Sequence, residues 1–243
     1  MQKFALLVFI SIPLLAQPDV IDFNQNGWFS YSGDHRVAGR WGIHFDAQWR
    51  RAQIITRWQQ YQFRPGVNFQ ANRNLLLTVG YAFTRTYPYG DFPGPGAFPE
   101  HRIYQQAVIR HPRTSVNISQ RFRLEQRFIE SPNSSNPRST TYSNRFRYMF
   151  RAELPLARNG DSEKTWYLPV WDEILLGIPP NMGARTFDHN RLFVGIGRAL
   201  GAGNIELGYM NQFVGQKNGQ IFEFNNTLFV TFTSTFDLSQ LWR

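Results

Sequence analysis

The segment V-N-I-S-Q-R-F-R-L-E-Q-R-F, from Val116 to Phe128, places apolar and charged residues on alternate positions. A second segment, Y-S-N-R-F-R-Y-M-F-R-A-E-L from Tyr142 to Leu154, repeats the pattern. A period of two is typical of β-strands that have one apolar and one charged face. Both segments are much longer than the about 5–6 residues common in soluble sheets. They therefore predict a transmembrane barrel, with aromatic residues facing outward and arginines facing inward.

The same alternation recurs along the rest of the chain, between turn-forming residues. Eleven segments show it, at residues 28–34, 41–51, 59–71, 75–85, 101–110, 116–128, 142–154, 165–176, 189–198, 204–213 and 222–236. Because single-chain bacterial barrels have even strand numbers, we expect a single antiparallel barrel of about 12 strands, with 10 as the alternative. Tight turns such as 71–74 alternate with long loops at Tyr87–Glu100 and Ser131–Thr141, as expected of a barrel with one periplasmic end.

The first residues have the features of a signal peptide. Lys3 supplies the charged start, Phe4–Leu15 the apolar region and Ala16 a small residue for cleavage. We therefore expect residues 1–17 to be a signal peptide and residues 18–243 to form one outer-membrane β-barrel domain. An N-terminal core strand is the alternative for the first segment. No run of about 18 apolar residues follows it, so no transmembrane helix is expected.

Composition supports this reading and weighs against others. Aromatic residues make up 16% of the chain, and the net charge of +9 comes almost wholly from 23 Arg against 3 Lys. Such a charge first suggests nucleic-acid binding. Here, however, the arginines alternate with apolar residues and accompany glutamates, as suits ion pairs in a crowded interior. We expect no nucleic-acid partner. The absence of cysteine excludes disulfides and thiolate metal sites.

The residues predicted to face the lumen form an arginine–glutamate set. They are Arg50, Arg121, Arg123, Glu125, Arg127, Arg145, Arg147, Arg151, Glu153, Glu173 and Arg191. Within this set, Glu173 and Arg191 are expected to form an interior pair. The set has two possible roles in a barrel of middle size: a salt-bridge network that plugs the lumen, or a constriction that favours small anionic solutes.

Evidence for catalysis is weak, so no catalytic residue, metal or cofactor is assigned. The five histidines lack metal-ligand spacing, and no G-x-S-x-G motif is present. The leading hypothesis is a non-enzymatic barrel, either a narrow solute pathway or a structural membrane component. A barrel-embedded lipid-modifying enzyme is the second hypothesis, with His101 or His189 as a base beside a serine. The third is a soluble periplasmic barrel that binds an apolar ligand, with apolar residues inward and arginines outward.

Short motifs distributed along the chain add a resemblance. They are W-x₆-Q-x-R at Trp41, Gln48 and Arg50, R-F-R-L-E-Q-R at 121–127, N-R-F-R-Y at 144–148, W-D-E at 171–173, N-R-L at 190–192 and E-L-G-Y-M-N-Q at 206–212. In this order they resemble a bacterial family catalogued as a domain of unknown function and thought to form outer-membrane-type β-barrels. The resemblance implies outer-membrane location and contact with lipid, but no established activity. It leaves the oligomeric state open. One departure is the C-terminal Leu241-Trp242-Arg243, since many outer-membrane barrels end in an aromatic residue.

Overall fold

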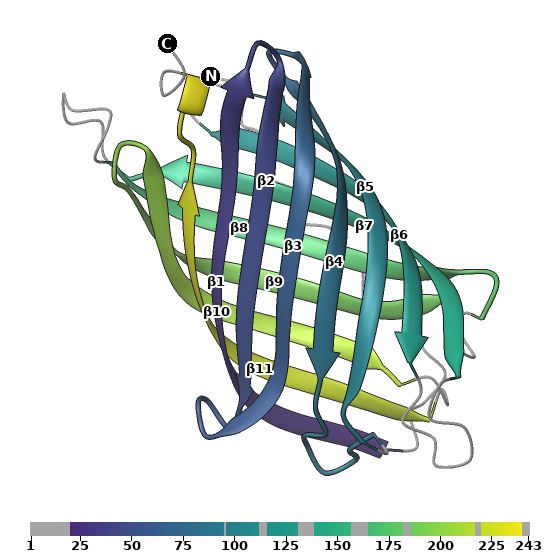
Figure 1. Ribbon diagram of the computed structural model, residues 1–243. Coiled ribbons are helices and arrows are strands. Elements are labelled where there is room, and N and C mark those ends of the chain that lie inside the picture. The colour runs from purple at the N-terminus through teal and green to yellow at the C-terminus, as the bar shows by residue number, and fades with distance from the viewer. Residues whose placement is uncertain are drawn as a thin grey trace.

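The computed structural model describes residues 20–94, 96–111, 116–130, 139–156, 165–181, 186–216 and 220–239, and these form a closed barrel of eleven strands (Figure 1). The expected signal peptide lies outside the described residues. The strands are β1 (Val20–Ala38), β2 (Trp41–Ala52), β3 (Arg57–Asn72), β4 (Leu75–Thr86), β5 (Phe98–His111), β6 (Asn117–Glu130), β7 (Thr140–Pro155), β8 (Trp166–Ile178), β9 (Phe187–Ala199), β10 (Gly203–Gly215) and β11 (Ile221–Ser234). None of the described residues belongs to a helix long and apolar enough to cross a membrane.

The strand number is eleven, so the expectation of 12 strands, or of 10, is wrong. Each strand pairs antiparallel with the next along the chain, but β1 and β11 close the barrel as a parallel pair. This follows from the odd number, because the first and last strands of an up-and-down barrel with an odd number of strands run in the same direction. The parallel register is continuous, from Val20 opposite Ile221 to Gly33 opposite Ser234.

β1 is far longer than the predicted segment 28–34. The residues of β1 before Trp28 at first alternate between the two faces as in the other strands, since Asp22 is buried while Ile21 and Phe23 are exposed. The alternation then weakens because Gln25 and Gly27 occupy positions that are apolar in other strands. The alternation therefore does not reveal the residues of β1 before Trp28, which belong to the parallel pairing with β11.

The two faces of the wall differ sharply along β4. Val79 is 59% exposed, whereas its neighbour Thr78 is 2% exposed. Leu77 and Tyr81 are also exposed, and Ala82 is buried. Apolar side chains thus cover the outer surface, and small or polar side chains point inward, as the period of two predicts.

The two ends of the barrel differ in their connections (Figure 1). At one end, here called the turn end, residues 39–40, 73–74 and 200–202 make tight turns, and β11 finishes. At the other, here called the loop end, β1 begins and residues 87–97 join β4 to β5. This loop is shorter than predicted because β5 already begins at Phe98. Most of the predicted loop Ser131–Thr141 lies outside the described residues.

Glycines in β3 and β4 allow an aromatic ring to lie against the inside of the wall. A Cβ on Gly80 would stand 2.5 Å from the ring of Tyr104, and one on Gly66 would stand 3.0 Å from its hydroxyl oxygen. Any larger residue at Gly80 would displace the ring. Tyr104 is 1% exposed and provides a floor on which interior side chains pack.

Candidate functional site in the barrel interior

One side of the interior is apolar. Trp28, Trp171, Phe193 and Met210 form a buried cluster, against which Met149 and Phe229 pack. The rings of Trp171 and Phe193 stack with centroids 5.2 Å apart, and Phe229 meets both edge-on. Offset stacks and edge contacts are favourable aromatic geometries. The cluster fills the lumen beside β8–β11 and leaves the remaining space to polar groups.

Beside this cluster, the part of the interior along β5–β9 is organised around buried glutamates. Glu173 on β8 accepts hydrogen bonds from Arg147 at 2.7 Å and from Arg121 at 2.7 Å, and Arg191 lies 3.2 Å away. Arg121 belongs to β6, which does not neighbour β8 in the sheet. Its contact with Glu173 therefore passes through the interior of the barrel. Planar guanidinium groups suit such shared, charge-assisted pairing.

Two further glutamates extend this arrangement toward the loop end. Glu125 accepts from Arg145 at 2.6 Å and from Arg147 at 2.8 Å. Glu100 accepts from Arg102 at 2.7 Å and from Arg127 at 2.5 Å. Because Arg147 bonds both Glu125 and Glu173, one connected network spans β5 to β9. We call this set of arginines, with Glu100, Glu125 and Glu173, the ion-pair network.

Arg123 stands at the middle of the barrel and is 2% exposed. Its Nε donates to Gln106 at 2.9 Å, and its guanidinium lies 4.7 Å from the ring centroid of Tyr104. Arg64 pairs nearby with Asp46 at 2.8 Å. Together with the apolar cluster, these side chains fill the lumen at mid-height.

The structure distributes the predicted residues over three groups. Arg121, Arg123, Glu125, Arg127, Arg145, Arg147, Glu173 and Arg191 belong to the ion-pair network or contact it. Arg151 lies nearer the turn end and pairs with Glu153 and Glu206. Arg50 lies apart from the carboxylates, 3.9 Å from the ring centroid of Trp28. The expected pair of Glu173 and Arg191 is present.

Sequence reasoning missed several members of these groups, namely Asp46, Arg64, Glu100, Arg102, Asp188 and Glu206. Glu100 falls within the predicted loop Tyr87–Glu100, although β5 already begins at Phe98, whereas Arg102 lies in the predicted segment 101–110 and was left out of the lumen-facing set. Arg64 does alternate with Tyr61 and Phe63, so the strand pattern indicates that the Arg64 side chain points inward. The pattern does not indicate its partner, because the register between β2 and β3 that brings Asp46 opposite Arg64 cannot be read from either strand alone.

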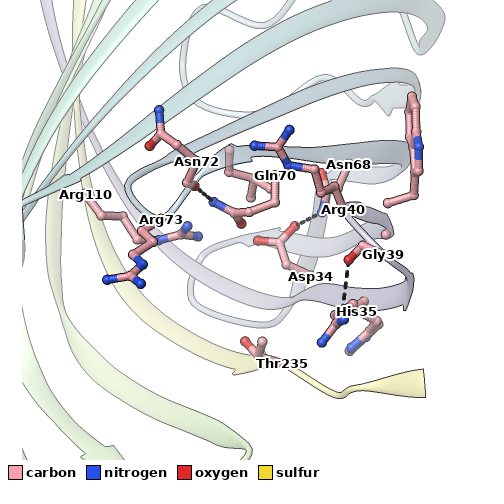
Figure 2. A pocket seen from close by; sticks show the side chains of 14 residues that line it. Asp34, His35, Gly39, Arg40, Asn68, Gln70, Asn72, Arg73, Arg110 and Thr235 are labelled. Atoms are coloured by element: carbon pink, nitrogen blue, oxygen red, sulfur yellow. Dashed lines mark hydrogen bonds between the residues drawn. The ribbon is translucent and has the colours of Figure 1, made fainter. Parts of the chain in front are cut away.

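A wide cavity of about 830 Å³ opens at the turn end. Figure 2 shows its lining, with Arg73 and Arg110 on one side and Asp34 held by Asn68 on another. Arg40 donates to the carbonyl of Ala71 in the same region. Within the part of the chain that the structure describes, Arg40, Arg73 and Arg110 form no ion pair with a carboxylate. This mouth, here called the turn-end vestibule, thus presents positive charge.

A smaller cavity of about 210 Å³ lies at the loop end, on the other side of the filled middle. Its lining includes Trp28, Arg50, His189 and Arg191. Tyr89, from the loop after β4, also lines it and donates its hydroxyl to Glu223 at 3.1 Å. Burial and the adjacent Glu223 carboxylate raise the pKa of Tyr89, so its hydroxyl stays protonated and can donate. We call this space the loop-end cavity.

The two candidate catalytic histidines have different surroundings. His101 lies on the outer face, 2.5 Å from the Tyr81 hydroxyl and 3.6 Å from Glu130. His189 is buried, and its Nδ1 lies 3.3 Å from Asp188. Among the described residues neither histidine is hydrogen-bonded to a serine, which is the arrangement that the lipid-hydrolase hypothesis needs. No three His, Cys, Asp or Glu side chains gather into a metal-binding group in the described ranges.

The arrangement of faces also bears on the soluble-barrel hypothesis. That hypothesis requires apolar residues inside and arginines outside, whereas the buried network of arginines and the exposed Val79 and Phe23 show the reverse. An apolar ligand would find a lumen already occupied by arginine, glutamate and a packed aromatic cluster.

Comparison with known proteins identifies a family but names no activity. A protein of Methylorubrum extorquens described as uncharacterised is 28% identical over 171 residues, which cover 69% of each chain. No solved structure matches. Residues 25–223 match the family described as "Protein of unknown function (DUF2490)", a range that runs from β1 into β11 and includes the ion-pair network and most of both cavities' linings. The chain belongs to this DUF2490 family.

Proposed function

We propose that this protein is a β-barrel of the bacterial outer membrane whose lumen is closed at mid-height, so that it acts as a structural and solute-binding membrane component. The observation that carries the closed lumen is the burial at its centre. The polar Arg123, Glu125 and Glu173, and Phe193 and Met210 of the apolar cluster, have exposed fractions of 0–2%. A lumen filled by such side chains leaves no continuous aqueous path.

The outer face supports the membrane placement. Phe23 is 70% exposed, Val79 59% and Trp41 56%, and every strand except β7 exposes large apolar side chains, whereas the outward rings of β7 are half-buried. Soluble monomers rarely expose apolar patches beyond a few hundred Å². A lipid environment removes this cost, and the closed sheet leaves no unpaired edge in the membrane. The turn end would face the periplasm and the loop end the outside, following the usual arrangement of such barrels.

Planar-bilayer recording tests the closed lumen. We expect purified protein inserted into a bilayer to give no conductance steps. Steps in the unmodified protein that change in selectivity with Arg123→Ala would instead establish the second candidate, a narrow pathway for anionic solutes. The two arginine-lined cavities, one at each end, favour that candidate over a pathway for cations.

A flotation experiment tests the membrane placement separately. Protein refolded in the presence of lipid vesicles is expected to rise with them through a density gradient and to resist extraction at high salt and alkaline pH. Recovery of folded protein in the lipid-free fraction would contradict the placement, whatever the conductance.

A further inference from the structure

The loop-end cavity is walled by guanidinium groups. The arginines in its lining are Arg50, Arg102, Arg127, Arg145, Arg147 and Arg191, and the carboxylates are Glu100 and Asp188. The lining arginines also pair with Glu125 and Glu173 behind the wall. The cavity therefore borders the ion-pair network on one side and the ring of Trp28 on the other.

Positive charge exceeds negative charge around this cavity. The lining and the ion pairs that it joins contain eight arginines and four carboxylates: Arg50, Arg102, Arg121, Arg123, Arg127, Arg145, Arg147 and Arg191 against Glu100, Glu125, Glu173 and Asp188. Glu223 lies near the rim, where Tyr89, Gln216 and Asn225 contact it. Adding this carboxylate leaves the excess in place.

Arg50 is the clearest source of the excess. It is 8% exposed, and its Nε donates to the neutral amide oxygen of Gln48 at 3.0 Å. Its other contact is the face of Trp28, against which Arg191 also lies, 5.3 Å from the same ring centroid. Among the described residues no carboxylate pairs with Arg50. Two guanidinium groups thus flank one ring, and only Arg191 has a carboxylate partner.

An unpaired buried guanidinium is costly. Arginine cannot lose its proton to escape the cost of burial, and an isolated buried charge is unfavourable without a partner. A small oxyanion in the cavity would supply that partner and accept two parallel hydrogen bonds from a guanidinium. Phosphate and carboxylate groups have the geometry that this fork matches.

Unpaired neutral groups indicate that the ligand also carries a hydroxyl. The buried Oε1 of Gln62 and Nε2 of His189 have no hydrogen-bond partner among the described atoms, and both residues line the cavity. Because Asp188 faces Nδ1 of His189, that nitrogen holds the proton and leaves Nε2 as an acceptor. A hydroxyl on the ligand, such as that of a monoprotonated phosphate, would satisfy one of these acceptors.

We propose that the loop-end cavity binds a small hydroxyl-bearing oxyanion, of the phosphate or hydroxycarboxylate class, with Arg50 as its principal unpaired cation. Side chains at mid-height close the inner end of this cavity, so it is a binding site and not a constriction in a channel. Because the lining is the same in a membrane or in water, the proposal does not depend on the membrane placement.

Calorimetric titration with inorganic phosphate tests the proposal. Protein in detergent micelles is equilibrated in phosphate-free buffer, and ionic strength is held constant with chloride. We expect saturable binding of one phosphate per chain, weakened at least tenfold by Arg50→Gln. Arg57→Gln is the matched control, because Arg57 is an exposed arginine at the same end of the barrel, and binding should not change. Absence of saturable binding, or equal weakening by both variants, would overturn the proposal.

Thermal unfolding gives a second readout that separates binding from misfolding. Without phosphate, Arg50→Gln should unfold at the same temperature as the unmodified protein or higher, since an uncompensated charge is removed. At saturating phosphate the order should reverse, because the bound ligand stabilises the native state of the unmodified protein. An Arg50→Gln variant that is less stable at every phosphate concentration would show that Arg50 is structural and would contradict the site.

Discussion

Replacing Glu173 by glutamine should be the most damaging single change in the ion-pair network. Arg121 pairs with no other carboxylate among the described residues, and Arg191 retains only the nearby side-chain amide of Gln212. Arg147 keeps Glu125. The substitution therefore leaves two guanidinium groups without a counter-charge, the buried one of Arg191 and the part-buried one of Arg121, whose side chain is 21% exposed. Removing one partner of a buried ion pair costs about 3–5 kcal/mol, and we expect Glu173→Gln to reduce the unfolding free energy by an amount in this range.

The assay is reversible urea unfolding in phosphate-free detergent micelles, followed by tryptophan fluorescence. Glu153→Gln is the matched control, because the Glu153 side chain is 28% exposed and its partner Arg151 keeps Glu206. It should lose about 0–1 kcal/mol. Adding Arg121→Gln to Glu173→Gln should restore part of the loss, with a coupling of about 0.5–3 kcal/mol. Equal small losses for Glu173→Gln and Glu153→Gln would refute the reasoning that the network is buried and mutually dependent.

Two further substitutions test the wall. Val79→Arg, on the outer face of β4, should cost about 2–4 kcal/mol in lipid vesicles if the position lies near the bilayer midplane; a change within about 0.5 kcal/mol, typical of a water-exposed site, would speak against lipid contact. Gly80→Ala should cost about 1–3 kcal/mol through overpacking, because its Cβ would stand 2.5 Å from the Tyr104 ring. Adding Tyr104→Ala to Gly80→Ala should relieve that clash, so in the same urea titration the double variant should lose less unfolding free energy than the sum of the two single losses. A double loss equal to that sum would show that the Tyr104 ring does not require glycine at position 80.

The sequence was sufficient to predict a barrel and the direction of most side chains, because the period of two is a local signal. The segments around Phe146 and Phe122 show it most clearly, and both lie in long strands of the structure. The number of strands required more than this signal. All eleven strands are visible as alternating segments, but a general rule of even numbers outweighed this count. The polar start of β1 hid only the residues before Trp28, which extend the parallel pairing of β1 with β11.

The candidate site was predictable residue by residue but not as a constellation. Inward alternation identifies Arg121 and Glu173, yet their contact joins non-neighbouring strands and depends on the shape of the lumen. The isolation of Arg50 is likewise invisible in the sequence, where Asp46 lies close by on the same face of β2. In the structure Asp46 pairs with Arg64 instead. Neither the cavities nor the filled middle follow from periodicity, since both depend on how side chains from many strands pack together.

A nitroxide scan of β4 tests most directly whether apolar side chains face lipid while polar side chains fill the interior. The chain contains no cysteine, so single cysteines can be introduced from Leu76 to Thr84 and spin-labelled without background. In lipid bilayers, labels at Leu77, Val79 and Tyr81 should collide with oxygen dissolved in the lipid, and labels at Thr78 and Ala82 should be shielded from both oxygen and a water-soluble nickel complex. Collision of the nickel complex with labels along the whole outward face would contradict the account.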